Sequence, residues 1–340
     1  MKVIMVGPGV KEKGGMATVI SNFQRYYAGN HQIEYVESWN SSHILAKVFN
    51  AIWQLHKRVK KEEKTVLHFH VAQNGSFFRK SLLAMLFKKR AMLIFHMHAS
   101  QFDVFFKESS APVKWLIATV LSATDQVVVL SQEWKLFYST IISTNIVVIE
   151  NAVSLIESHP YNPWSLNVIT LGKIGERKGS FDTLQVAQRL PEINFLLFGD
   201  GDTSELQHLI KNRQIKNVFI GGWIDEATKL LLFADASLHL LPSYHEGLPM
   251  SVLETMAVGI PNMATSVGGI PQVIDSETGY LVAPGDLEAM VDGLKRHFNQ
   301  LELRQTMSVA ARQRIEKKFS IESFFDKWNM LYDELEKGDL

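Results

Sequence analysis

The chain has 340 residues, of which 46% are hydrophobic and 21% are charged, so two domains are predicted and disordered or fibrous classes are excluded. It contains no cysteine, which excludes disulfides, thiolate zinc sites and a cysteine nucleophile. The 35 Lys and Arg residues balance the 35 Asp and Glu residues, and this formal net charge of zero argues against a nucleic-acid-binding protein.

Short apolar runs alternate with helical patterns along the whole chain, as in a parallel sheet covered by helices. The expected strands of the first half are Lys2–Val6, Ile33–Val36, Thr65–His70, Met92–His98, Gln126–Leu130 and Ile146–Ile149. Those of the second half are Val168–Leu171, Phe195–Phe198, Val218–Ile220, Ser237–Leu241, Pro261–Ala264 and Tyr280–Val282. Two doubly wound α/β domains are predicted, because one open sheet of so many strands would be uncommon.

Two helices stand out by their periodicity, and a linker separates the halves. Apolar residues at helical spacing, beginning at Leu45, predict a helix over Ile44–Lys60. Helices dominate the chain from Asp286 on. A broad apolar stripe predicts a core-facing helix over Ile321–Glu336, through Phe324, Phe325, Trp328, Leu331, Tyr332 and Leu335. The domain boundary is expected near Asn151–Trp164, which holds Pro160 and Pro163 and shows little periodicity.

The first chemistry-bearing loop follows the expected strand Val168–Leu171. In open parallel sheets, ligands bind beyond the carboxyl ends of the strands. The loop Gly172–Gly179 places Lys173, Arg177 and Lys178 beside the N-terminus of a helix that begins near Ser180. Cations, free backbone N–H groups and the helix dipole together form an anion site that suits a diphosphate.

The second such loop runs from Pro242 to Met250. Pro249 suits the first position of a helix, which would direct the amides of Gly247 and Leu248 at a ligand, with Glu246 just ahead of them. Glu254 lies on this helix among apolar residues, where a carboxylate is costly without hydrogen-bond donors. Sugar or ribose hydroxyls would supply such donors.

Glu246 and Glu254 stand in the pattern Pro-Ser-Tyr-x-Glu-Gly-Leu-Pro-x4-Glu. This pattern resembles the donor-site signature of the family 4 retaining glycosyltransferases (glycosyl transferases group 1), which have the two-Rossmann-domain GT-B fold. Other matching segments follow in order: Gly14-Gly15, His96–His98, Asn151–Val153, Gly172–Gly179, Gly199–Gly201, Val267–Ile270 and Thr278–Val282. The resemblance covers essentially the whole chain and is strongest over residues 168–282.

The resemblance implies two Rossmann-like domains facing across a cleft, with the C-terminal helix returning to the N-terminal domain. Residues 1–153 with about 320–340 would bind the acceptor, and residues 154–319 would bind the nucleotide-sugar donor. The activity implied is retaining transfer of a hexose-type sugar from a nucleotide diphosphate sugar, commonly UDP-linked. The acceptor would be a saccharide or lipid-linked saccharide of bacterial-type polysaccharide or glycolipid biosynthesis.

Individual roles follow from the same resemblance. Lys178 matches the lysine that binds the donor diphosphate, and Lys173 stands where the family usually has arginine. Glu246 matches the carboxylate near the donor sugar, and Glu254 the one that holds the ribose. In the N-terminal domain, Gly15 would approach the phosphates and His98 would hydrogen-bond the donor sugar. Glu246, Lys178 and His98 are the expected catalytic residues. The leaving diphosphate would take up the acceptor proton, so no opposed pair of carboxylates is required.

Other patterns favour competing sites. The alternating histidines His68, His70, His96 and His98 have a spacing that can hold zinc, although no carboxylate cluster accompanies them. Asp200-Gly-Asp202 resembles a metal motif of single-domain glycosyltransferases, but its position matches a strand-ending turn instead. We expect no metal and no cofactor, because cations and a helix N-terminus already serve the diphosphate.

Two other functions remain as alternatives. A Rossmann-type oxidoreductase would need a third glycine after Gly7-Pro-Gly9, and the sequence lacks it. A non-catalytic nucleotide-sugar-binding module would show no turnover, which release of a nucleoside diphosphate would distinguish from an enzyme.

Charge is divided unequally between the halves. Residues 1–153 hold 18 Lys and Arg against 10 Asp and Glu, a net of +8, and residues 154–340 hold 17 against 25, a net of −8. The basic residues gather around two expected helices: Lys47, Lys57, Arg58, Lys60, Lys61 and Lys64, and then Arg79, Lys80, Lys88, Lys89 and Arg90. We expect a cytoplasmic protein whose basic face meets an anionic membrane surface. The N-terminal segment is expected to be a strand and not a signal peptide.

Overall fold

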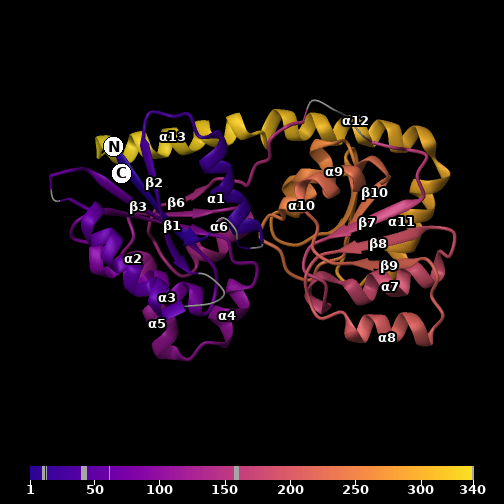
Figure 1. Cartoon of the computed structure of the whole chain (residues 1–340), viewed down its shortest axis with the longest axis horizontal. Coiled ribbons are helices and arrows are strands. Elements are labelled where there is room, and N and C mark those ends of the chain that lie inside the picture. The colour runs from indigo at the N-terminus through magenta and orange to yellow at the C-terminus, as the bar shows by residue number, and fades with distance from the viewer. Residues whose placement is uncertain (10–11, 13, 40–43, 61, 157–160, 339–340) are drawn as a thin grey trace. The chain divides into compact units, whose positions relative to one another are not determined.

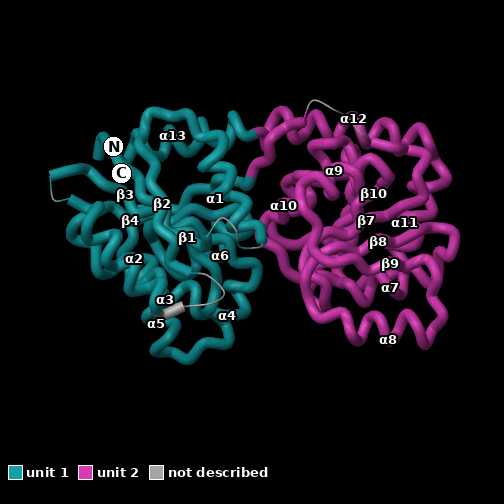
Figure 2. Tube along the Cα trace, in the orientation of Figure 1, with its two compact units in different colours: residues 1–151, 321–340 teal, residues 152–320 magenta. Residues whose placement is uncertain are grey.

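The computed structural model describes residues 1–9, 12, 14–39, 44–60, 62–156 and 161–338. The chain divides into two compact units, which Figure 2 colours separately. Unit 1 comprises Met1–Asn151 and Ile321–Leu340, and unit 2 comprises Ala152–Ser320. The expected boundaries lie within two residues of these. Pro160 and Lys61, which the sequence arguments used, lie outside the described residues.

Unit 1 is built on a six-stranded sheet in the order β2-β1-β3-β4-β5-β6. All neighbouring strands are parallel. The strands are β1 (Lys2–Pro8), β2 (Gln32–Trp39), β3 (Thr65–Val71), β4 (Met92–Met97), β5 (Gln126–Val129) and β6 (Ile146–Val148). The sheet is sandwiched between helices, so its central strands are buried on both faces, and they are mostly apolar apart from buried histidines on β3 and β4.

The helices of unit 1 cover the two faces of this sheet unequally. They are α1 (Gly15–Tyr26), α2 (Ile44–Arg58), α3 (Gly75–Phe87), α4 (Phe102–Glu108), α5 (Ala111–Ser122), α6 (Gln132–Ser139) and α13 (Ile321–Lys337). With right-handed crossovers, the strand order places α1 on one face and the helices from α2 to α6 on the other. One core cluster accordingly joins apolar side chains of α2, α3 and α5 (Figure 1).

The C-terminal helix α13 packs on α1 and on the central strands β3 and β4 of the sheet. The ring of Phe23 lies 5.3 Å from that of Phe324, 5.1 Å from Phe325 and 5.7 Å from Trp328. The whole expected stripe is buried, and Trp328 and Tyr332 are fully buried. The predicted return of this helix to the N-terminal part of the chain is confirmed.

Unit 2 repeats the design with the order β12-β11-β10-β7-β8-β9, again all parallel. Its strands are β7 (Asn167–Leu171), β8 (Asn194–Phe198), β9 (Val218–Gly221), β10 (Leu238–Leu241), β11 (Asn262–Thr265) and β12 (Gly279–Val282). Its helices are α7 (Ser180–Arg189), α8 (Ser204–Asn212), α9 (Glu226–Ala234), α10 (Met250–Ala257), α11 (Leu287–Asn299) and α12 (Leu301–Lys318). Every strand expected from the sequence is present, so the predicted pair of doubly wound sheets is confirmed.

Within the described ranges, no helix combines the length and apolar character that crossing a membrane requires.

Candidate active site

The centre of the sheet in unit 2 brings the chemistry-bearing loops together. Strand β10 lies between β7 and β11, and all three run parallel. The loops that follow them therefore emerge at the same edge. These loops are residues 172–179, 242–249 and 266–269, and they overlap the segments that the sequence singled out, Gly172–Gly179, Pro242–Met250 and Val267–Ile270.

An ion pair joins the first two loops. Lys178 Nζ lies 2.6 Å from Glu246 Oε1, and the two side chains are only 13% and 6% exposed. A short charge-assisted hydrogen bond in such a poorly solvated place is strong, and each charge neutralises the other. The structure thus brings together two residues that lie 68 positions apart and that the sequence assigned to the donor sugar and its diphosphate.

Two glycines make room for this pair. Gly179 has φ +68°, a left-handed conformation, and a Cβ atom there would collide with the carbonyl oxygen of Pro242. Gly172 has φ +138°, and its Cβ would lie 3.3 Å from Cε of Lys178. The first glycine allows the two loops to touch, and the second leaves space for the lysine side chain.

Arg177 has a different role from the predicted one. Its Nη1 donates to the carbonyl of His245 at 2.8 Å, and its own carbonyl accepts from the amide of Tyr244 at 2.9 Å. Arg177 therefore fastens the two loops together, whereas the sequence argument grouped it with the anion-binding cations. The short helical turn Glu176–Lys178 places its side chain toward the second loop and not toward open solvent.

A third loop closes over the second. The amide of Gly269 donates to the carbonyl of Gly247 at 2.6 Å, and both Gly247 and Leu248 are buried. Pro249 is the residue before the first helical position, which Met250 occupies, so the expected placement is wrong by one residue. The cause is the backbone of Pro249, which remains extended with ψ 129°.

Glu254 has a partner that the sequence did not predict. It lies on α10, and its Oε2 is 3.0 Å from Nζ of Lys229 on α9. Burial raises the pKa of Glu254, and the attraction of Lys229 opposes that rise. The inference that Glu254 requires hydroxyl donors from a ligand is therefore weakened, because the protein itself supplies a cation. Lys229 was missed because its helix carries no motif, and only its proximity in space reveals it.

His239 is a second residue that the sequence analysis missed. It lies on β10, is fully buried, and hydrogen-bonds Asn262 Oδ1 through Nδ1 at 2.5 Å. Burial lowers its pKa to about 4; the charge of Lys178 adds to this effect and that of Glu246 opposes it. Its Nε2 has no hydrogen-bond partner among the described residues. The sequence did contain one signal for this residue, because a single histidine stands in an apolar strand directly before the second loop.

In unit 1, His98 follows β4 directly and is part of a group of four histidines. His70 Nδ1 lies 2.9 Å from His98 Nε2, and the backbone amide of His98 donates to Val71 at 2.7 Å. Burial, with the nearby charge of Lys80, lowers the pKa of His98 to about 3. The imidazole is thus neutral at neutral pH, and His70 fixes its orientation.

The other three histidines of this group are core residues. His68, His70 and His96 are fully buried, and the His68 ring stacks on Trp328 with centroids 4.4 Å apart. His68 also contacts the hydroxyl of Tyr332 at 2.8 Å. Nitrogens of these three histidines lie within 4.8 Å of one another, a spacing that could admit a metal. Pairwise hydrogen bonds and packing against α13 account for the arrangement, so we interpret it as structural.

The remaining predicted residues occupy loop and helix ends. Gly15 is exposed and begins α1, directly after Gly14, whose φ of +120° favours glycine. Lys173 is exposed in the first loop of unit 2. Asp202 accepts a hydrogen bond at 3.0 Å from the amide of Ser204, the first residue of α8.

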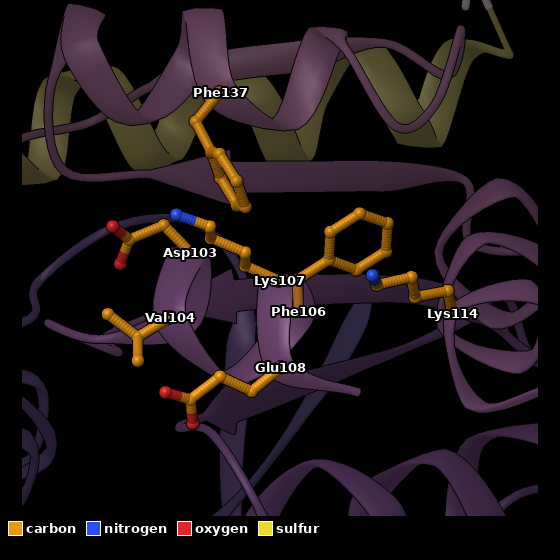
Figure 3. A pocket seen from close by; sticks show the side chains of 7 residues that line it. All are labelled: Asp103, Val104, Phe106, Lys107, Glu108, Lys114 and Phe137. Carbon is orange, nitrogen blue, oxygen red and sulfur yellow. The ribbon is translucent and has the colours of Figure 1, made fainter. Parts of the chain in front are cut away.

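A separate hollow of about 550 Å³ lies in unit 1 among α4, α5 and α6 (Figure 3). Phe106, Phe137 and two lysines line it, together with Asp103, Val104 and Glu108. None of the residues that the sequence assigned to the donor site contributes to it. The Lys178–Glu246 pair, by contrast, combines charge, low exposure and the carboxyl edge of a parallel sheet, which are features of a ligand site.

The chain is similar to known proteins both in sequence and in structure. Residues 157–314 match the family described as Glycosyl transferases group 1. The chain is 33% identical over 174 residues to sulfoquinovosyl transferase SQD2 of Arabidopsis thaliana, covering 49% of this chain and 33% of that protein. It is 33% identical over 151 residues to N-acetyl-alpha-D-glucosaminyl L-malate synthase of Bacillus anthracis, covering 44% and 39%. The chain thus spans well under two thirds of the length of these relatives.

A longer alignment joins the chain to UDP-Gal:alpha-D-GlcNAc-diphosphoundecaprenol alpha-1,3-galactosyltransferase of Escherichia coli. The identity is 25% over 317 residues, covering 85% of this chain and 80% of that protein. Among solved structures, sucrose-phosphate synthase of Thermosynechococcus elongatus has a TM-score of 0.83 at 17% identity, covering 99% and 100%. The Anabaena protein Alr3699/HepE in complex with UDP has a TM-score of 0.77 at 14% identity, covering 98% and 100%. These likenesses confirm the predicted two-domain fold of the GT-B type.

Proposed function

Because residues 157–314 match the family described as Glycosyl transferases group 1, we propose that the chain transfers a hexose-type sugar from a UDP-sugar with retention of configuration. The proposed acceptor is a saccharide or lipid-linked saccharide of polysaccharide or glycolipid biosynthesis. Relatives that act on a diphosphoundecaprenol-linked sugar or bind UDP support this choice of donor and acceptor.

The observation that carries the proposal is the Lys178–Glu246 pair at the edge of the sheet in unit 2. A largely buried lysine beside a helix N-terminus suits the diphosphate of a donor, because both contribute positive potential. Glu246 can accept hydrogen bonds from sugar hydroxyls while Lys178 turns toward the phosphates. Lys173, exposed in the same loop, adds a second positive charge.

In the proposed reaction, the bond between the sugar C1 and the diphosphate oxygen breaks as the bond to the acceptor oxygen forms on the same face. The acceptor hydroxyl proton passes to the leaving diphosphate oxygen. Lys178 and the start of α7 stabilise the negative charge that develops on the diphosphate. Glu246 and His98 orient the sugar, and Glu254 holds the ribose.

A non-catalytic nucleotide-sugar-binding module is the alternative. It would show donor binding without release of UDP, so turnover separates it from the enzyme. An oxidoreductase is less well supported, because the first loop lacks the glycine spacing of a dinucleotide site.

Donor binding is tested by thermal shift with a panel of nucleotides and nucleotide sugars. UDP and UDP-sugars should stabilise the wild type by about 2.7 kcal/mol at 100 times the dissociation constant.

Glu254→Gln should weaken UDP binding by about tenfold or more, because a charged hydrogen-bond acceptor for the ribose is lost. Glu226→Gln is the matched control: it also contacts Lys229, at 3.3 Å, but is 74% exposed. Equal UDP affinity in Glu254→Gln and the wild type would exclude the ribose role.

Activity should not depend on a divalent metal, because Lys173, Lys178 and the N-terminus of α7 neutralise the diphosphate. Dialysis against EDTA should leave the rate of UDP release unchanged. Loss of activity with EDTA and its recovery on adding Mn²⁺ or Mg²⁺ would contradict this expectation. Asp200 and Asp202 would then be the candidate metal ligands.

A further inference from the structure

The outer surface of α2 carries large apolar side chains that the described residues of unit 1 leave exposed. Phe49 and Trp53 are four residues apart, so they lie on one side of the helix, and they are 71% and 57% exposed. Ala51 and Leu55 of the same helix are fully buried in the core cluster. The helix is therefore apolar on its outer side as well as on its core-facing side.

Helix α3 repeats this pattern. Phe78, Leu82 and Leu86 are exposed and spaced at intervals of four, while Leu83 and Phe87 belong to the core. On α5, Trp115 is 69% exposed. The three helices pack on the same face of the sheet and lie close together in Figure 1.

The charge on these helices has a single sign. None of α2, α3 and α5 contains an aspartate or glutamate. Basic residues follow the apolar stripes at the C-terminal ends of α2 and α3: His56, Lys57 and Lys60, and then Lys88, Lys89 and Arg90. Arg90 Nη1 lies 3.5 Å from His56 Nδ1, so the two basic ends are adjacent. Lys57 Nζ lies 3.6 Å from the centre of the Trp53 ring.

We propose that this docking surface, made of Phe49, Trp53, Phe78, Leu82, Leu86, Trp115 and the adjoining basic residues, binds an anionic lipid bilayer. Tryptophan and phenylalanine favour the boundary between headgroups and acyl chains, and lysine and arginine favour anionic headgroups. A second copy of the same surface would bring like charges together, whereas a negatively charged bilayer complements both the charge and the apolar side chains. The proposal deepens the proposed function, on which it rests for the lipid-linked acceptor.

The apolar side chains change the expected effect of salt. Charge alone would allow high salt to release the protein completely, as the basic sequence pattern implies. Insertion of aromatic and leucine side chains adds a contribution that scales with buried apolar area and that salt does not screen. High salt should therefore weaken binding to anionic vesicles without abolishing it.

Vesicle flotation of the full chain, without donor or acceptor, tests the proposal. The probes are vesicles of phosphatidylcholine alone and of phosphatidylcholine mixed with phosphatidylglycerol. The wild type should float with the mixed vesicles and far less with the neutral ones. The variant Phe49→Ser/Trp53→Ser/Trp115→Ser should bind mixed vesicles at least about tenfold more weakly, because each side chain loses its apolar insertion.

The matched control is Trp164→Ser, since Trp164 of unit 2 is 71% exposed and lies outside the docking surface. It should float like the wild type, and circular dichroism should show that all variants are folded. The proposal is overturned if the wild type does not float with mixed vesicles, or if the triple variant floats equally well. A wild-type dimer that the triple variant loses, without vesicle binding, would assign the surface to a second copy instead. Because no transfer is measured, these outcomes are independent of whether the chain is a glycosyltransferase.

Discussion

Lys178→Ala should lower the rate of UDP release in the transfer assay by about 10²-fold or more. The lysine is the buried cation beside the start of α7, and the loss of one preorganised stabilising group for a developing negative charge has an effect of this size. Glu246→Gln should lower the rate similarly if the carboxylate orients the donor sugar. Lys216→Ala, which removes an exposed lysine elsewhere in unit 2, is the control and should retain wild-type activity.

The ion pair also changes the expected stability of these variants. The sequence alone indicated that single replacements would leave the fold intact, because each residue would serve only a ligand. The structure shows that removing Lys178 takes away the cation that neutralises the 6% exposed carboxylate of Glu246, which costs up to about 3 kcal/mol. Lys178→Met/Glu246→Gln removes both charges and should recover the melting temperature while remaining inactive. A double variant that is stable and fully active would contradict the catalytic assignment of both residues.

Gly179→Ala should destabilise unit 2 and also lower activity by about 10²-fold. The left-handed φ of +68° costs an alanine about 1–2 kcal/mol, and its Cβ would push against the backbone of Pro242. That push would separate the loop of Lys178 from the loop of Glu246, and a shift of about 1 Å in catalytic groups can cost this much in rate.

The measurements are the melting temperature and the rate of UDP release. A loss of about 2 kcal/mol should lower the melting temperature by roughly 4–8 °C for a unit of this size. Gly222→Ala is the matched control, because its Cβ would meet no atom within 4 Å and its φ is not in the left-handed region. Wild-type stability and activity in Gly179→Ala would show that the two loops do not depend on this close approach.

Much of the fold and the position of the site could be predicted from sequence because both depend on local patterns. A buried parallel strand is a short apolar run, and a loop that binds anions is marked by glycines and cations next to a helix start. The loops 172–179 and 242–249 were located in this way. The interaction partners of the side chains within the site could not be predicted, because they belong to segments that lie far apart in the sequence.

Glu254 illustrates the difference. On α10 its neighbours in sequence are apolar, so the sequence indicated a carboxylate without a protein partner. Folding places α9 against it and supplies Lys229 at 3.0 Å. Arg177 likewise resembled an anion-binding cation, yet it bonds to the carbonyl of His245. The partner of a side chain depends on which helices and strands pack together. The sequence around one residue does not show which distant segment will lie against it.

The sequence by itself determined the two α/β domains, the edge of the sheet where chemistry can occur, and the basic character of the first half. These properties follow from the order of apolar runs, the glycines between them and the count of charges. Only the tertiary structure decided that Lys178 and Glu246 form one pair, that the charges of both act on the pKa of His239, and that α13 packs on the histidines of unit 1. It also decided which apolar residues of α2, α3 and α5 remain outside the core. A helix that is apolar on two sides can be buried on either of them, and packing against one sheet face leaves the other apolar side exposed.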